Sequence, residues 1–272
     1  MYIAKSLENS ILNFLDRIPI LSFYAKTRGW PYVIAWCHRI AGLILVSYLW
    51  LHIYRLCYLS SPNLYDATMK TYGFFFSAIL GFALAIPLIF HALNGGRLIL
   101  YENFGKRDDE AMIRWVFGLS VLYLGILGLI LLMGNQSISP FLFWLISVTI
   151  ALILGYEVTT HIRNRSHSFY WKLQRMTGGF LLVMVPAYFL FMHLNPFPGM
   201  EADRVIIWTE IRLVGAVRLV LLMAALYHGG YGIWSIVSDY LSSRILRIGF
   251  AFLVTLVMLL FAWMCVKLTL GI

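Results

Sequence analysis

The chain has 272 residues, of which 61% are hydrophobic and only 12% are charged, and it carries a formal net charge of +9. A soluble domain holds about 25% charged residues, so this composition excludes an ordinary water-soluble protein and predicts one built in lipid. No dense basic helix or aromatic–basic platform is present, and a nucleic-acid partner is therefore not predicted. The three cysteines are scattered without a C-x-x-C pair, which predicts neither a zinc site nor a disulfide framework.

Seven apolar segments follow one another along the chain, each long enough to cross about 30 Å of hydrocarbon as a helix. None shows the short alternation of a membrane barrel, so we predict an all-α, polytopic membrane helix bundle surrounded by lipid. Residues 1–31 precede the first segment, and we interpret them either as an amphipathic helix on the membrane surface or as a tail that orders against a partner. The seven segments are Tyr32–Tyr58, Gly73–Leu98, Ile113–Met133, Phe141–His161, Met176–Leu194, Ile211–Val237 and Ile248–Leu270.

The basic residues predict the orientation of these segments. If the N-terminus is cytoplasmic, fifteen lysines and arginines fall in the inner segments and five in the outer ones. This asymmetry follows the positive-inside rule, so the net charge is mostly topological. We therefore predict a multi-pass protein of the cell inner (cytoplasmic) membrane. The first thirty residues lack the features of a cleavable signal peptide.

Four histidines lie deep within the apolar segments, two in each half of the chain: His52, His91, His193 and His228, whereas His38, His161 and His167 sit at cytoplasmic helix ends. A histidine in lipid is costly unless it binds or pairs with something. At helical rise His91 and His228 lie about 9 and 16 Å from the inner boundary, whereas His52 and His193 lie about 20 and 27 Å outward. These depths pair His91 with His228 and His52 with His193. We predict two bis-histidine metal sites, each holding a b-type haem, stacked across the bilayer.

The similarity between the halves extends beyond histidine. The first long segment opens with Cys37-His38-Arg39-Ile40-Ala41-Gly42, and the fifth opens with Leu173-Gln174-Arg175-Met176-Thr177-Gly178. His91 and His228 are each followed four residues later by a glycine on the same helical face. We therefore divide the chain into an N-terminal interfacial segment (1–31), a first repeat (32–134), a connecting transmembrane helix (135–170) and a second repeat (171–272).

Arginines near these histidines are candidates for binding haem propionates, because carboxylates favour guanidinium partners. A second interpretation makes the histidines and Arg218 an intramembrane relay in a proton- or ion-conducting or transporter bundle. Inverted repeats would favour transport, but these two repeats share one orientation. A third interpretation is a scaffold without haem that only docks soluble subunits. The propionate candidates are Arg97, Arg175, Arg218, Arg55 and Arg212.

Two groups of motifs resemble a known family. The motif from His38 to Gly42, with His91-x-x-Asn94-Gly95-x-Arg97, resembles the large cytochrome b anchor of succinate dehydrogenases and fumarate reductases. The motif His228-x-x-x-Gly232-x-Trp234, followed by Ser238-Asp239-Tyr240, resembles the small anchor of the same enzymes. The resemblance implies that both anchors are fused in one chain, with Phe141–His161 as the extra crossing. The four membrane histidines are similar to those of the two-haem type.

The resemblance implies a haem b-containing membrane subunit of a succinate:quinone oxidoreductase that is not catalytic alone. It would pass electrons between an iron–sulfur partner subunit and membrane quinone, with a flavoprotein subunit acting on succinate. The chain has no dinucleotide fingerprint or cysteine cluster, so flavin and clusters belong to partners. By motif match, the quinone site holds Arg39, Asp239 and Tyr240. The family serine falls on Ala35, so either a nearby donor such as Trp36 or His38 takes its place or the quinone sits elsewhere.

Overall fold

The computed structural model describes residues 17–72, 74–105, 109–133, 139–194, 201–210 and 212–270. Within these ranges the chain is helical, with short connections and no strand. The side chains of a few helical residues, including His193 and Arg212, lie outside the description. Residues 1–16, the greater part of the predicted interfacial segment, are also outside it.

Seven long helices confirm the predicted all-α membrane bundle. They contain 23 to 31 residues and therefore span about 35 to 46 Å. Six are long and apolar enough to cross a membrane, and the seventh, α6, contains the shorter apolar stretch Trp115–Ile130. The long helices are α3 (Trp30–Leu56), α5 (Phe74–Phe104), α6 (Asp109–Met133), α7 (Pro140–Ile162), α8 (Phe169–Leu194), α10 (Arg212–Tyr240) and α11 (Arg244–Leu270).

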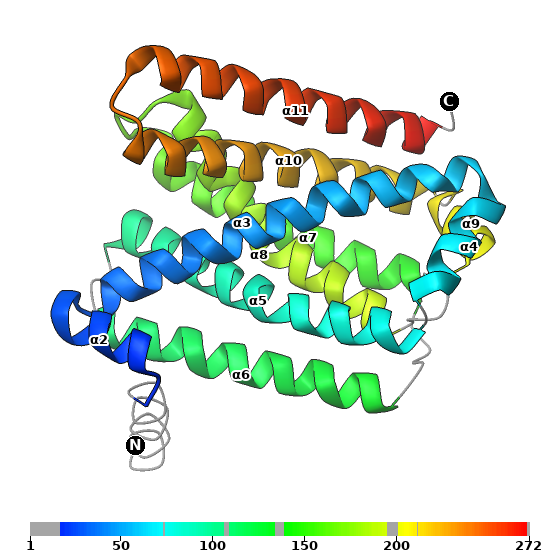
Figure 1. Ribbon diagram of the computed structural model, residues 1–272, viewed down its shortest axis with the longest axis horizontal. Coiled ribbons are helices and arrows are strands. Elements are labelled where there is room, and N and C mark those ends of the chain that lie inside the picture. Colours follow the sequence, from blue (N-terminus) through cyan, green and yellow to red (C-terminus); the bar gives the residue numbers. More distant parts are fainter. Residues whose placement is uncertain are drawn as a thin grey trace.

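Short helices mark the two ends of the bundle (Figure 1). Helix α2 (Pro19–Arg28) precedes α3 at one end, which we call the α2 end. Helices α4 (Pro62–Tyr72) and α9 (Ala202–Glu210) lie together at the other, the α4–α9 end, where the Ala202 backbone N–H donates to the Asp66 carboxylate at 2.8 Å. Helices α4 and α9 each follow the first long helix of a repeat. The order long–short–long–long therefore occurs twice, with α7 between the two sets.

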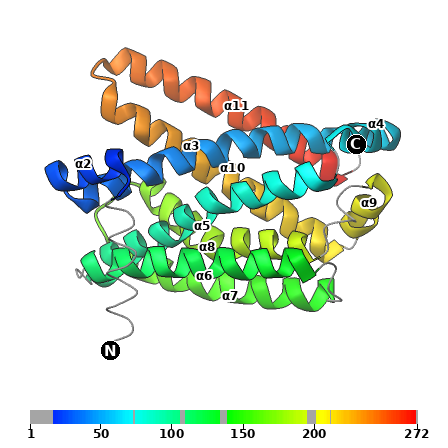
Figure 2. The ribbon, with the colours of Figure 1, turned by 60° about the horizontal axis from the view of Figure 1, so that its bottom comes forward.

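Four of the long helices form a closed inner bundle. Helix α3 contacts α5, α5 contacts α8, α8 contacts α10, and α10 contacts α3, while α6, α7 and α11 pack on the outside (Figures 1 and 2). Glycines allow two of these approaches. A Cβ atom at Gly229 would lie 2.8 Å from Val46 of α3, and one at Gly230 would lie 2.8 Å from Met258 of α11. Helix α10 is thus held closely between α3 and α11.

Candidate functional site

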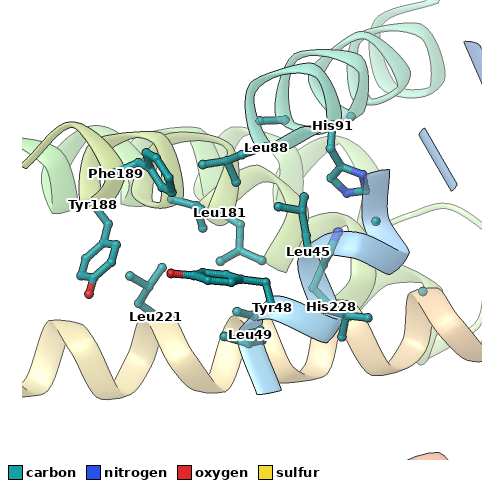
Figure 3. Close-up of a pocket in the computed structure, with 18 of the residues that line it drawn as sticks. Leu45, Tyr48, Leu49, Leu88, His91, Leu181, Tyr188, Phe189, Leu221 and His228 are labelled. Atoms are coloured by element: carbon teal, nitrogen blue, oxygen red, sulfur yellow. The ribbon is translucent and has the colours of Figure 1, made fainter. Parts of the chain in front are cut away.

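The inner bundle encloses a cavity of about 900 Å³ with mostly apolar walls. All four of its helices contribute side chains. Figure 3 shows His91 of α5 and His228 of α10 at one end, and the hydroxyls of Tyr48 and Tyr188 toward the other. One cavity therefore contains groups that the sequence assigned to two different depths.

His91 and His228 face each other across the cavity. Their ring centres are 6.2 Å apart and their planes are nearly perpendicular, at 88°. A metal ion makes bonds of about 2 Å to imidazole nitrogen, so two rings on opposite sides of one iron have centres about 6 Å apart. The pair thus has the spacing that bis-histidine ligation of a single metal requires.

The other ring nitrogen of each histidine is held by the protein. The Nδ1–H of His91 donates to the backbone carbonyl of His38 at 3.2 Å, and Nδ1 of His228 lies 3.5 Å from the Thr177 hydroxyl. That hydroxyl already donates to the Leu173 carbonyl at 2.8 Å, so it accepts from His228. Each ring therefore has its Nε2 atom available as a neutral ligand, and its orientation is set from behind.

Glycines bring the two repeats close to these rings in the same way. A Cβ atom at Gly42 would lie 3.1 Å from Cε1 of His91, and one at Gly178 would lie 3.2 Å from Cε1 of His228. The glycines of the two opening motifs are therefore structurally equivalent. Each leaves just enough room for an imidazole against the backbone of the neighbouring helix.

His38 belongs to this end of the cavity. Its ring stacks on His91 with centres 3.9 Å apart and planes within 6°. Five buried polar side-chain atoms lack a hydrogen-bond partner among the described residues, and three of them are Nδ1 of His38, Nδ2 of Asn94 and Oε1 of Gln174. All three residues line the cavity. Orphaned polar atoms in a lipid-surrounded bundle are costly, so this end is suited to a bound group with polar substituents.

These features fit a haem iron, which His91 and His228 would hold as its two protein ligands. Haem supplies four ligands of its own and takes one or two from the protein. Among the described residues, no group of three or more His, Cys, Asp and Glu side chains is placed to hold a metal ion in another way. Thr177 and Gln174 had not been identified from the sequence. A sequence signal was available for Gln174 alone, which occupies in the second repeat the place of His38 in the first.

The other end of the cavity contains His52, whose ring lies against Tyr48 with centres 5.7 Å apart. The His193 side chain is outside the description, and its backbone lies in the last turn of α8. Counted from the equivalent glycines Gly42 and Gly178, the counterpart of His52 is Tyr188. His193 lies five residues further along, or about 7.5 Å. The pairing of His52 with His193 stays a prediction.

Four of the five candidate arginines line the cavity: Arg55, Arg97, Arg175 and Arg218. Arg97 is buried and donates to the Asn94 side chain at 2.9 Å, within the motif that contains His91. Arg175 is bound to the Glu102 carboxylate, with one bond of 2.7 Å, so that carboxylate already occupies it. The fifth, Arg212, has its side chain outside the description.

Arg218 and Arg55 lie toward the α4–α9 end of the cavity. Arg218 makes no hydrogen bond or ion pair with any residue that the structure describes, although a guanidinium inside a membrane bundle needs a partner. Arg55 donates to the Met69 sulfur at 2.9 Å. Tyr65 of α4 lines the same end, where burial raises its pKa to about 12 and keeps the phenol neutral. This end is therefore cationic.

A second group of predicted residues meets at the α2 end, between α3 and α10. The Arg39 guanidinium donates to the Tyr240 hydroxyl at 3.0 Å and to the Asp239 carboxylate at 2.7 Å. The Trp36 ring lies 6.1 Å from that of Tyr240. The Arg39 and Asp239 side chains are 33% and 51% exposed. Four of the five predicted quinone-site residues are thus together, and only His38 lies elsewhere, against His91.

Arg39 connects this surface group to the cavity. Its side chain lines the cavity, as do those of Ala35 and Ser235, while its guanidinium reaches Tyr240 outside it. His38, the preceding residue, stacks on His91. Two adjacent residues of α3 therefore contact the two groups: His38 contacts the histidine pair, and Arg39 belongs to the surface group.

Comparisons with known proteins agree with the motifs. Residues 27–132 match the family described as succinate dehydrogenase/fumarate reductase transmembrane subunit. The chain is 35% identical over 95 residues to the succinate dehydrogenase 2 membrane subunit SdhC of Mycobacterium tuberculosis (strain ATCC 25618 / H37Rv), an alignment that covers 34% of this chain and 69% of that protein. No solved structure matches the chain significantly.

Proposed function

Because the chain belongs to the family of succinate dehydrogenase/fumarate reductase transmembrane subunits, we propose that it is the haem b-containing anchor of a succinate:quinone oxidoreductase, with both anchor modules in one chain. The observation that carries the haem assignment is the pair formed by His91 and His228, 6.2 Å apart across the cavity. Bound haem would supply one-electron redox chemistry. The second repeat carries an equivalent glycine, Gly178, which supports the fusion.

The chain's own residues hold and shield this group. His91 and His228 present Nε2, while the His38 carbonyl and the Thr177 hydroxyl fix the two rings. The apolar walls exclude water, which strengthens the electrostatic influence of the nearby Arg97. We assign the polar substituents of the group to the orphaned atoms of Asn94 and His38 and to Arg97.

Quinone reduction is assigned to the group at the α2 end. A quinone carbonyl oxygen gains negative charge and a proton when it is reduced, so it needs a phenol donor and a cation. Tyr240 supplies the hydroxyl and Arg39 the charge, and Asp239 holds the guanidinium in place. Trp36 provides a flat apolar wall beside them. The Ala35 position carries no hydroxyl, so these groups act without the family serine.

This assignment places the partners at the same end. An iron–sulfur subunit would dock at the α2 end and deliver electrons next to Tyr240, and a flavoprotein subunit would oxidise succinate beyond it. We propose that this end faces the cytoplasm, as the distribution of basic residues predicts. A second haem would bind at His52 and His193, with Arg55 and Arg218 as partners for its carboxylates.

Absorption spectra of the purified complex test the proposal. We expect b-type bands that appear on reduction with dithionite and that co-purify with flavin- and cluster-containing subunits. A proton relay or a scaffold without haem would give no such bands. A spectrum without haem, taken from a complex that still oxidises succinate with a soluble dye, would contradict the electron-transfer role while preserving the anchor role.

A further inference from the structure

A groove lies on the outside of the bundle, between α10 and α11 at the α2 end. It measures about 360 Å³ and is separate from the central cavity. One wall is Trp234 of α10, and the other is formed by the first two turns of α11 with Arg244, Arg247, Ile248 and Ala251. The groove therefore combines two arginine side chains, an indole and an aliphatic surface at one end of a membrane-spanning helix pair, and its walls are almost entirely apolar.

The two arginines lie on the same side of α11, where both line the groove. Their positions, three residues apart, put them on neighbouring turns. Both are exposed, and neither side chain makes a hydrogen bond or ion pair with any residue in the described part of the chain. Asp239, near the end of α10, is bound to Arg39 instead. Two adjacent cations without an acidic partner favour an anionic ligand.

Below the arginines the groove is apolar and continues into the lipid-facing surface of α11. Ile248 is 60% exposed and Phe252, one turn further, is 71% exposed. Trp234 lies at the depth where tryptophan is enriched in membrane proteins, with an amphipathic ring at the water interface. A ligand that fits both parts has an anionic head and an apolar chain.

We propose that this groove binds an anionic phospholipid of the leaflet at the α2 end, with its phosphate between Arg244 and Arg247 and an acyl chain along Ala251 and Ile248. Charge complementarity selects this occupant, because basic pockets between transmembrane helices bind acidic headgroups. The lipid would fasten α11 to α10 where only the three residues Leu241–Ser243 connect them. The site uses no residue of the haem or quinone groups.

The test counts lipids that stay with the intact complex. The complex is reconstituted in phosphatidylcholine vesicles with a minor fraction of phosphatidylglycerol, extracted in mild detergent and analysed by native mass spectrometry. We expect wild type to retain phosphatidylglycerol, and Arg244→Gln with Arg247→Gln to bind it roughly thirty-fold more weakly, since each arginine near the surface contributes about fivefold. Ala251→Phe keeps both charges but fills the groove, and it should also lose the lipid.

The matched control is Lys26→Gln with Arg28→Gln, which removes the same charge from α2 at the same end. It should retain phosphatidylglycerol, and all variants should keep the haem spectrum of wild type. Equal retention in wild type and the Arg244/Arg247 variant would overturn the proposal. An equal loss of phosphatidylglycerol in the α2 control would also overturn it, because it would show that any basic residues at this end attract anionic lipid without a specific site. Release of the soluble subunits with unchanged lipid content would assign the arginines to protein docking instead.

Discussion

Arg39 belongs both to the surface group and to the lining of the cavity. Its guanidinium donates to the Tyr240 hydroxyl and the Asp239 carboxylate at the same time. A planar guanidinium serves two acceptors in fixed directions, which the single ammonium of lysine does not reproduce. The side chain also lies over the Trp36 ring, 5.7 Å from its centre. Its position is therefore determined by three neighbours.

Tyr240→Phe and Arg39→Lys should each impair quinone reduction while leaving assembly and haem intact. Losing one stabilising contact to a charging oxygen costs roughly 10²–10³ in rate. The measurement is the ratio of quinone-linked to dye-linked succinate oxidation, because the dye takes electrons before the membrane subunit. Tyr156→Phe, on the exposed side of α7, is the matched control and should keep the wild-type ratio. An unchanged ratio in both test variants would place the quinone elsewhere.

At the residue scale the structure brings together three of the groups that the motifs singled out and separates a fourth from them. Arg39 is 200 residues from Asp239 and 201 from Tyr240 in sequence, and the three side chains meet as the motifs implied. His38 was placed with them, but helical geometry turns it about 100° away from Arg39, toward His91. Thr177 and Gln174 were missed because a hydroxyl and an amide in a helix look like ordinary polar residues until their partner is known.

At the element scale, glycines set how closely the inner helices approach. Gly42 and Gly178 leave room for the two imidazoles, and Gly229 lets α10 pack against α3. Elsewhere a glycine has no such role: a Cβ atom at Gly155 or Gly249 would meet nothing within 4 Å. Position within the fold, and not residue type, therefore decides which substitutions are harmful.

Gly42→Ala and Gly178→Ala should each lower haem retention at the His91–His228 site. The added methyl would contact an imidazole at 3.1 or 3.2 Å, so the ring must shift by a few tenths of an ångström. Disturbing the orientation of a ligating histidine costs about 10–100-fold in metal affinity. Haem content after purification is the measurement, with Gly155→Ala as the control. Full haem content in both test variants would show that the rings do not need this packing.

Gly229→Ala should loosen α10 from α3. Its methyl group would lie 2.8 Å from Val46, and overpacking of this kind costs about 1–3 kcal/mol of stability. Thermal unfolding in detergent should show a lower midpoint than wild type, whereas Gly249→Ala should not. The double variant with Val46→Ala restores the space and should recover stability. A double variant as unstable as the single one would refute the contact as the cause.

At the scale of the whole molecule, the sequence predicted the long helices well and did not predict the short helices at the ends of the bundle. The seven apolar segments match seven long helices, since lipid forces each crossing to be a helix of sufficient length. Helix α8 begins at Phe169, before the predicted Met176, because Lys172 and Arg175 continue the helix beyond its apolar part. Helices α4 and α9 were not predicted, as short helices outside the hydrocarbon leave no long apolar run.

The two repeats correspond most closely around His91 and His228. Each has an equivalent glycine against its ring and a partner for its Nδ1 atom, which is the His38 carbonyl for His91 and the Thr177 hydroxyl for His228. His52 has Tyr188 as its counterpart, and the cationic end of the cavity combines Arg55 and Arg218 with phenols. The pattern of one histidine near the outer end of each of these helices did not reveal this difference between His52 and His193, because a histidine in either of the last two turns satisfies it.

The most direct test of the central claim is haem stoichiometry in single-histidine variants, measured by pyridine haemochrome analysis against protein mass. We predict two haems per chain in wild type, and one in His91→Ala and in His228→Ala, with identical residual spectra because both lose the same haem. His52→Ala should lose the other haem and leave the complementary spectrum. If His91→Ala and His228→Ala retain different haems, or if wild type contains none, the pair of histidines across the cavity does not hold iron and the account is wrong.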